Sequence, residues 1–178
     1  MVIMLRHTEV AAHWRGRCYG ARDVGLSAQG RAAARHLAAT LEGAGIRRVQ
    51  ASPLRRARFL GGLLARRLGL PLEIVPALAE RDFGEWEGQS WDAIHAAHGD
   101  AMMGMIEAPG HFRPGGGETT EELGARVLAW HAGLPPGQGV LAVTHGGPVA
   151  ALRGRLAGRP VPEWLALVPA PGEAVRLP

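Results

Sequence analysis

Two histidines in this sequence stand directly after short apolar runs, in positions suited to phosphate chemistry. Arg6 and His7 follow the run at residues 2–5, and His145 follows the run at residues 139–144. Such runs are typical of buried strands, and open α/β folds bind their ligands at the carboxyl ends of parallel strands. An arginine can grip phosphate oxygens with a planar fork of donors, while a neutral histidine can attack phosphorus with a ring nitrogen.

The dipeptide Arg6-His7 is weak evidence by itself, because the chain contains 20 residues of the Lys and Arg types and eight histidines. The end of the second apolar run, at residues 139–144, supports a phosphate site. His145 is followed by Gly146 and Gly147, where a helix is expected to begin, and the free backbone N–H groups of a helix start can hold an anion. Two histidines at the ends of core strands therefore predict a common anion site.

A third candidate element is the predicted helix over residues 53–68, for which Ser52-Pro53 would supply the N-cap and the first helical residue. Arg55, Arg56 and Arg58 crowd its first turns. Cationic side chains there oppose the helix macrodipole and cost stability unless an anion lies among them. We expect the Arg55 and Arg58 side chains to extend into solvent, which leaves Arg56 as the candidate for the site.

Cap, turn and apolar signals predict the elements that position these residues. Ser27 is expected to cap a helix that ends at about Glu42, with Gly43 as its stop. Thr119 or Thr120 is expected to cap a later helix. The predicted strands are residues 2–5, 46–51, 72–75, 139–144 and 174–177, and the predicted helices are residues 27–42, 53–68, 90–98, 119–132 and 146–157. The loop 8–26 and the Met-, Gly- and Pro-rich segment 102–117, a candidate lid, are long enough to suggest function.

Length and composition indicate one globular domain, residues 1–178, whose core needs no disulfide or metal. Apolar residues make up 47% of the chain and charged residues 20%, which argues against disorder. No apolar run approaches the roughly 18 residues of a membrane span, and the start lacks the basic region of a secretory signal. The single Cys18 cannot form an internal disulfide. We therefore expect a cytoplasmic protein with no membrane partner.

The charge distribution argues against a nucleic-acid partner. All 20 residues of the Lys and Arg types are arginine, and the formal net charge is only +4. A nucleic-acid surface would require arginines clustered on one element with aromatic residues between them, whereas these arginines are scattered. A basic surface can still steer an anionic substrate towards the protein.

Two other kinds of site, a metal centre and a nucleotide-binding loop, lack part of their pattern in this sequence. His95 and His98 could share a helix face, but no third ligand at zinc-like spacing accompanies them. The glycines at 115–117 resemble a phosphate cradle, but the chain contains no lysine, which excludes a P-loop nucleotidase. We expect neither a metal ion nor a cofactor.

Taken together, the motifs resemble those of the histidine phosphatase superfamily, whose fold is also called phosphoglycerate-mutase-like. The resemblance spans almost the whole chain, and the motifs occur in the family's order. They are Leu5-Arg6-His7, Gly20 with Asp23 and Leu26-Ser27, Ser52-Pro53-Leu54 with Arg56, Leu78 and Glu80 with Phe83-Gly84, Trp86-Glu87-Gly88, Gly116-Gly117-Glu118 and Thr144-His145-Gly146-Gly147. The resemblance implies an α/β fold of three layers, α/β/α, with a mostly parallel central sheet.

The resemblance also implies roles for individual residues. His7 would be the nucleophile that is phosphorylated during turnover, and Glu80 would donate a proton to the leaving oxygen and then activate water. General acid–base help of this kind is worth about 10²–10⁴ in rate. Positive and hydrogen-bonding groups would neutralise the transferring phosphoryl group without a metal ion. The phosphate-binding groups so implied are Arg6, Arg56, His145 and Gly146, and His145 is also counted as catalytic.

The chain departs from the family pattern just after the nucleophile. Where the family usually has glycine, an acidic or amide residue, threonine and, three positions beyond, asparagine, this chain has Thr8, Glu9, Val10 and His13. Arg-His-Thr, followed by Gly-x-Cys-Tyr-Gly and an aspartate, resembles one branch of the family, the α-ribazole phosphatases of cobalamin synthesis. The residues expected to contact substrate are His13, Tyr19 and Gly20, with His13 able to donate a hydrogen bond in place of asparagine.

The resemblance implies a metal-independent phosphomonoesterase for α-ribazole 5′-phosphate, a small phosphorylated substrate. The nearest alternative is a broad-specificity phosphatase for sugar phosphates or nucleotides. A phosphoglycerate mutase usually has a longer insertion after the Glu80 motif and is less favoured. A non-catalytic phosphate-binding regulator is also less favoured, because it would have no use for a proton donor such as Glu80. The sequence is compatible with a homodimer.

Several apolar side chains are candidates for the wall of such a substrate site or for ordinary core. Trp91 and residues 102–105 could contact an apolar moiety such as dimethylbenzimidazole. Trp86 is expected to belong to the core instead.

Overall fold

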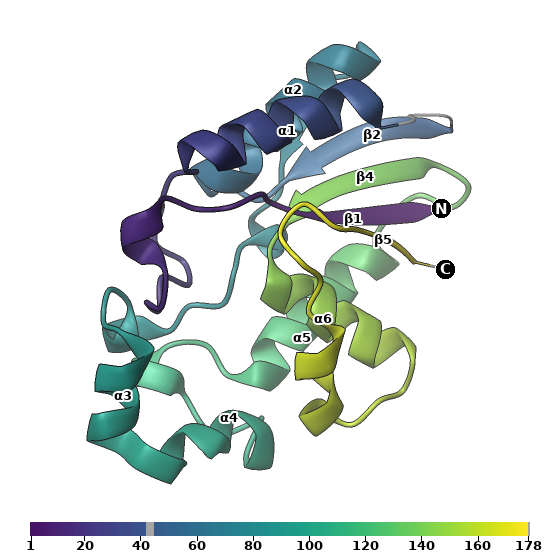
Figure 1. Ribbon diagram of the computed structural model, residues 1–178. Helices are drawn as coiled ribbons and strands as arrows, with labels where there is room; N and C mark the ends of the chain where they lie inside the picture. The colour runs from purple at the N-terminus through teal and green to yellow at the C-terminus, as the bar shows by residue number, and fades with distance from the viewer. Residues whose placement is uncertain (42–44, 178) are drawn as a thin grey trace.

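The computed structural model describes residues 1–41 and 45–177, and Figure 1 shows a sheet between two helical layers. The strands are β1 (Val2–Arg6), β2 (Ile46–Ala51), β3 (Leu72–Ile74), β4 (Gly139–Thr144) and β5 (Ala174–Leu177). The helices are α1 (Ala28–Thr40), α2 (Arg55–Leu68), α3 (Trp91–His98), α4 (Gly104–Glu107), α5 (Thr120–Ala132) and α6 (Gly146–Leu156). Short 3-10 helices lie at Ala12–Trp14, Pro76–Leu78, Gly84–Trp86, Gly99–Met103, Pro114–Gly116 and Val161–Leu167.

The five strands form one sheet in the order β3-β2-β4-β1-β5. The pairs β2–β3, β2–β4 and β1–β4 are parallel, and β5 pairs antiparallel with β1. The predicted α/β fold with a mostly parallel sheet is therefore confirmed. In the β1–β4 register, Arg6 lies opposite Thr144. The residues that follow, His7 and His145, must then emerge side by side at the carboxyl edge of the sheet.

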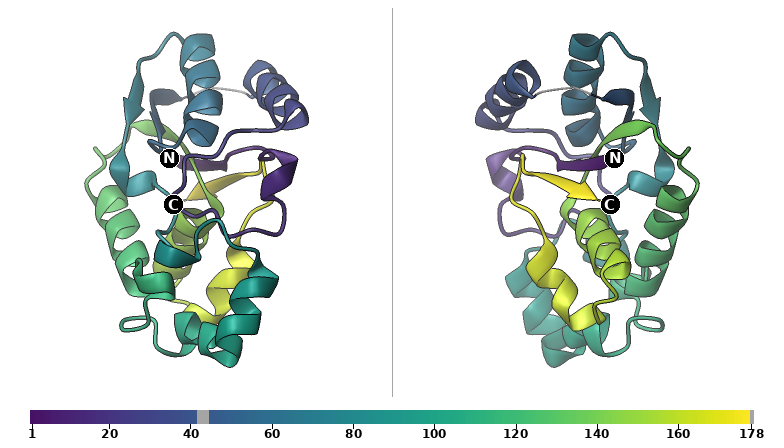
Figure 2. Two further views of the ribbon diagram at one scale, coloured as in Figure 1. Left: turned by 90° about the vertical axis from the view of Figure 1, so that its left-hand side faces the viewer. Right: turned by 90° about the vertical axis from the view of Figure 1, so that its right-hand side faces the viewer.

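The sheet is apolar on both faces because helices cover both, as the views in Figure 2 show. Along β1, side chains alternate between the faces. Ile3 and Leu5 pack in one cluster with α1 and α2, and Val2 and Met4 pack in the other cluster with α5 and α6. This double burial explains why β1 is a continuous apolar run, and it gives the three layers that the sequence predicts.

Two predicted helix caps are confirmed. The Ser27 hydroxyl accepts a hydrogen bond from the Gly30 N–H at 2.8 Å. Thr119 forms a capping box with Glu122, since each side chain accepts a hydrogen bond from the other residue's backbone N–H. Helix α1 ends at Thr40, while the predicted end at Glu42 and the stop at Gly43 lie outside the described residues.

The predicted start of α2 at Ser52-Pro53 is wrong. The helix begins at Arg55, after an extended Leu54, because the Ser52 hydroxyl is engaged elsewhere, with His145 at 2.7 Å and with the Leu54 N–H at 3.2 Å. A carboxylate oxygen of Asp23 accepts a hydrogen bond from the Arg55 N–H at 2.5 Å instead. A side chain from a loop distant in sequence thus accepts the hydrogen bond of a free backbone N–H group at the start of α2.

Helices α3 and α4 lie beyond the carboxyl ends of the strands (Figure 1). They enclose a small separate cluster in which Cys18, Trp86 and Ile94 are buried, as predicted for Trp86. The segment 102–117, expected as a lid or long loop, includes α4, the 3-10 helix Pro114–Gly116 and the end of the 3-10 helix Gly99–Met103. None of the helices in the described residues is long and apolar enough to cross a membrane.

Candidate active site

His7 and His145 meet at the end of the two central strands. The His7 N–H donates to the Thr144 carbonyl oxygen at 2.9 Å, and the two imidazole rings lie edge to face with centroids 5.1 Å apart. Both side chains are buried, with 2% and 0% exposure. The parallel register of β1 and β4 therefore produces the pair that the sequence predicts.

The hydrogen bonding of His7 leaves one ring nitrogen free to react. Its Nδ1 lies 2.7 Å from the Thr8 carbonyl oxygen, which can only accept, so Nδ1 carries the proton. Nε2 then has its lone pair available. Burial, followed by the positive charge of Arg56, lowers the pKa of His7 from 6.5 to about 3. The ring is therefore neutral near neutral pH, as a nucleophile must be.

His145 is fixed by a polar partner on each ring nitrogen. The Arg56 Nε–H donates to Nδ1 at 3.2 Å, so Nε2 carries the proton and donates to the Ser52 hydroxyl at 2.7 Å. Burial and the neighbouring Arg56 charge hold the pKa of His145 well below its usual range.

Arg56 is buried completely, with 0% exposure. Its two terminal nitrogens donate to the carbonyl oxygens of Gly20 and Arg22 at 2.6 Å each, and its guanidinium lies over the Tyr19 ring at 5.2 Å. Tyr19 and Gly20, predicted to contact substrate, therefore lie against a phosphate-binding candidate. The loop 19–22 holds the Arg56 guanidinium beside the histidine pair.

Arg6 supplies the second guanidinium. One terminal nitrogen donates to the Pro169 carbonyl oxygen at 2.6 Å, whereas Nε is buried and has no hydrogen-bond acceptor among the described residues. A Cβ built on Gly146 would lie 3.5 Å from this Nε, so Arg6 faces the first turn of α6. A buried donor without a partner at a helix start suits an anion.

Glu80 reaches the same helix start at the next residue, Gly147. One carboxylate oxygen accepts from the Gly147 N–H at 3.3 Å and the other from the Arg81 N–H at 2.9 Å. A Cβ on Gly147 would overlap the carboxylate, so glycine is needed for this approach. Arg126 holds the Glu80 backbone, since it donates to the Glu80 carbonyl oxygen at 3.2 Å and pairs with Glu118.

Two adjoining cavities open beside Arg6, His7 and Glu80, whereas the fully buried Arg56 and His145 lie behind this surface and line neither cavity. The larger, about 420 Å³, has Glu80 and Gly147 in its wall, and the smaller, about 290 Å³, has His7 in its wall. Four residues line both cavities, namely Arg6, Arg17, Tyr19 and Trp91. A phosphoryl group between His7 and Glu80 would therefore lie where the cavities meet.

His13 does not join this arrangement. It is exposed in the turn Ala12–Trp14, and it is not among the residues that line either cavity. Its neighbour Trp14 lines the smaller cavity instead. At the family position usually occupied by asparagine, this chain therefore has an exposed residue outside both cavities.

The sequence did not single out several residues that the structure places at the site. Arg17 and Arg81 line the larger cavity, Ser52 binds His145, and Arg126 holds the Glu80 loop. Ser52 belongs to one of the family motifs, but its place before Pro53 predicts a helix cap, which leaves no signal for its contact with His145. Nothing local in the sequence distinguishes the other three from the remaining arginines.

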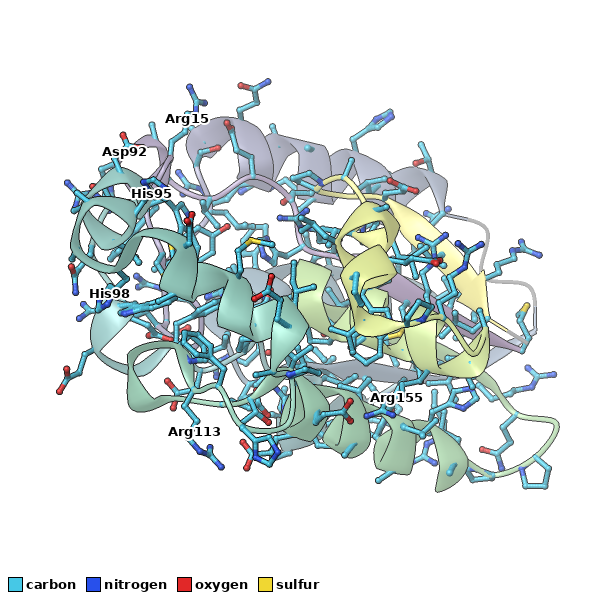
Figure 3. The ribbon with its side chains drawn as sticks, turned by 90° about the horizontal axis from the view of Figure 1, so that it is seen from below. Arg15, Asp92, His95, His98, Arg113 and Arg155 are labelled. Atoms are coloured by element: carbon cyan, nitrogen blue, oxygen red, sulfur yellow. The ribbon has the colours of Figure 1, made fainter. Side chains whose placement is uncertain are left out.

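His95 and His98 lie on α3, at the end of the molecule where Arg15 and Asp92 are also labelled in Figure 3. Nε2 of His98 accepts a hydrogen bond from the Trp86 indole at 3.1 Å. Among the described residues, no group of three or more His, Cys, Asp or Glu side chains is arranged to hold a metal ion.

The lowered pKa of His7 predicts a loss of stability in acid. The unfolded chain binds a proton at this residue below about pH 6.5, whereas the folded protein does so only near pH 3. Stability should therefore fall as pH drops through this window, and His7 should contribute about 3 kcal/mol of the loss by about pH 4. Urea unfolding of His7→Gln across the same range should show a shallower decline. Equal slopes for the two proteins would contradict a buried neutral His7.

Comparisons with known proteins agree with this geometry. The sequence model of the histidine phosphatase superfamily (branch 1) matches residues 2–177. The solved structure of a mycobacterial glucosyl-3-phosphoglycerate phosphatase superposes with a TM-score of 0.84 at 30% identity, covering 97% of this chain and 87% of the other. The adenosylcobalamin/alpha-ribazole phosphatase of Escherichia coli is 29% identical over 88% of this chain and 79% of its own length.

A further relative is the 2,3-bisphosphoglycerate-dependent phosphoglycerate mutase of Methylobacterium radiotolerans, 33% identical over 85% of this chain and 76% of its own length. The family match over nearly the whole chain, together with the superposition, defines the class. The chain belongs to the histidine phosphatase superfamily, and it is a phosphatase of that superfamily.

Proposed function

We propose that this phosphatase hydrolyses α-ribazole 5′-phosphate through a phosphohistidine at Nε2 of His7. The observation that supports the substrate most directly is the apolar character of the larger cavity, which adjoins Glu80. The mechanism rests on the free Nε2 of His7 and on the positive charges of Arg56 and Arg6, both of which act on its ring.

The first half-reaction transfers the phosphoryl group to the protein. Nε2 of His7 attacks phosphorus, the N–P bond forms as the bond to the leaving oxygen breaks, and Glu80 gives that oxygen a proton. Arg6 and Arg56 neutralise the charge on the non-bridging oxygens. The Thr8 carbonyl stabilises the positive charge that develops on the His7 ring, because it accepts a hydrogen bond from Nδ1.

The second half-reaction releases phosphate. Water enters the space left by the alcohol, and the Glu80 carboxylate takes its proton as the oxygen attacks phosphorus. The N–P bond breaks, inorganic phosphate leaves and His7 returns to its neutral form. The same carboxyl group thus serves first as acid and then as base.

The leaving group must lie in the larger cavity because Glu80 protonates it from that wall. Apolar and aromatic side chains dominate this wall, among them Phe83, Trp91, Met105, Ile106, Leu123 and Trp164. A flat apolar base such as dimethylbenzimidazole would bury its surface there, at about 25 cal/mol per Å². A bare sugar phosphate would leave this apolar wall in contact with water.

A phosphate-release assay without added metal tests the substrate. We expect kcat/KM for α-ribazole 5′-phosphate to exceed the values for simple sugar phosphates, nucleotides and 3-phosphoglycerate by about a hundredfold, or ~2.7 kcal/mol. A chelator should leave the rate unchanged. A flat profile across these substrates would contradict the substrate assignment, and loss of activity with the chelator would contradict a metal-independent reaction.

A second substrate class is favoured by Arg81. Its guanidinium lines the larger cavity and lies 5.6 Å from the Phe83 ring centroid, and within the described part of the chain it forms no hydrogen bond or ion pair. Burial lowers the pKa of Arg81, although the nearby Glu80 and Glu118 carboxylates act in the opposite direction, so the charge would be stabilised further by an anion in the cavity. A leaving group with a carboxylate, as in glucosyl-3-phosphoglycerate, would supply one.

Arg81→Met separates the two substrate classes. If Arg81 binds the carboxylate of the leaving group, this variant should lower kcat/KM for glucosyl-3-phosphoglycerate about 30-fold. That is the loss expected for a hydrogen bond to a charged group. Its kcat/KM for α-ribazole 5′-phosphate should stay within twofold. Equal losses on both substrates would mean that Arg81 acts on Glu80 or the phosphoryl group instead.

A further inference from the structure

We propose that the Thr8 side chain is a positioning element for the nucleophile, because it fixes the carbonyl group that sets the tautomer of His7. The inference rests on the proposed role of His7. It concerns a residue at which this chain departs from the usual glycine of its superfamily, and it assigns a role to the hydroxyl that a glycine lacks.

The tautomer of His7 depends on the Thr8 carbonyl group. A neutral imidazole can carry its proton on either nitrogen, and the hydrogen bond made by one nitrogen decides the state of the other. Nδ1 of His7 donates to the Thr8 carbonyl oxygen at 2.7 Å. If this oxygen turned away, the proton could move to Nε2 and block attack on phosphorus.

The Thr8 side chain is in turn attached to helix α1. Its hydroxyl donates to the Gly30 carbonyl oxygen in the first turn of α1 at 2.8 Å, and the side chain is buried with 2% exposure. Its methyl group packs towards Gly172, where a Cβ would lie 3.5 Å from it. The hydroxyl therefore connects the backbone beside the nucleophile to a long helix.

The peptide after Thr8 is held from its other end as well. The Ser27 N–H donates to the Glu9 carbonyl oxygen at 3.1 Å, and the Ser27 hydroxyl donates to the Glu9 carboxylate at 2.8 Å. A Cβ on Gly30 would overlap the Glu9 carbonyl, so α1 packs directly against this backbone. With both ends attached to the start of α1, the carbonyl that accepts from His7 has little freedom to rotate.

The test compares Thr8→Val, which keeps the shape of the side chain and removes the hydroxyl, with Thr8→Ser, which keeps the hydroxyl. Two-bond ¹H–¹⁵N spectra of the uniformly labelled full-length protein report which His7 nitrogen is protonated, with His7→Gln used to assign the signals. Thr40→Val is the matched control, because its hydroxyl bonds to the His36 carbonyl at the far end of the same helix.

We expect wild type to show protonated Nδ1 and bare Nε2, and Thr8→Val to show a mixture of both tautomers. Its kcat should fall about tenfold with KM unchanged, the scale of loss when a partner that orients a histidine is removed. Thr8→Ser should restore both readouts, and Thr40→Val should match wild type. An unchanged spectrum in Thr8→Val, or a Thr8→Ser variant as defective as Thr8→Val, would overturn the proposal.

The spectrum also separates this inference from the proposed function. It is read without substrate, so a tautomer change in Thr8→Val would support the positioning role even if no tested phosphomonoester were hydrolysed. Activity that survives in a protein without His7 would instead remove the nucleophile assignment, whatever the spectrum shows.

Discussion

Replacing His7 with alanine is expected to lower kcat by about 10⁴-fold or more, because the group that forms the covalent intermediate is lost. The expectation rests on the free Nε2, the neutral ring and the two guanidinium groups at this position. Rapid-quench labelling should show a phosphorylated protein in wild type that is stable in base and labile in acid. The variant should give no label at all.

The matched control for this experiment is His13→Ala. His13 is exposed and outside both cavities, so its loss should leave kcat/KM within about twofold, as is usual for surface changes. A His7→Ala variant with measurable phosphate release and label would show that another residue is the nucleophile. A large loss in His13→Ala would show that the turn Ala12–Trp14 closes onto substrate.

Glu80→Gln is expected to lower kcat by about 10²–10⁴-fold while KM changes little, since the amide cannot transfer a proton but keeps the shape of the carboxyl group. The structure supplies the geometry: Glu80 lies in the wall of the larger cavity and is held by the Gly147 N–H at the start of α6. The loss should shrink for p-nitrophenyl phosphate, because its leaving group needs no protonation. Steady-state rates with both substrates measure the difference.

Glu85→Gln is the control for Glu80→Gln. Glu85 is exposed in the same stretch of chain and does not line either cavity, so this variant should behave as wild type. Equal losses of Glu80→Gln on both substrates would argue that the carboxylate acts on the second half-reaction alone. Full activity of Glu80→Gln on both substrates would remove this residue from the mechanism.

The sheet and the histidine pair could be predicted from the sequence because their signals are local. A continuous apolar run such as β4 predicts a strand buried on both faces, and the residue after such a strand emerges at its carboxyl end. The sequence alone therefore predicts that His7 and His145 lie at one edge of the sheet. The caps at Ser27 and Thr119 were predicted for the same reason, since a cap acts within three residues of itself.

Local patterns do not predict features that depend on residues distant in the sequence. Ser52 has the residue type of a cap, but its hydroxyl binds His145 instead, across 93 positions of sequence, and Asp23 caps α2 from 32 positions away. His13 was expected at the site by analogy with asparagine, yet the turn that contains it directs Trp14 towards the cavity.

The sequence by itself determined the α/β class, the superfamily resemblance and the residues at the strand ends, because periodicity is a property of neighbouring positions and the order of short motifs can be read along the chain without knowing any contact. Only the tertiary structure decided that Thr8 binds α1, that Arg126 holds the Glu80 loop, and that Arg81 lines an apolar cavity. The 20 arginines of the chain all have the same side chain. What each does depends on the carbonyl, carboxylate or open space that folding places beside it, and no local pattern encodes that choice.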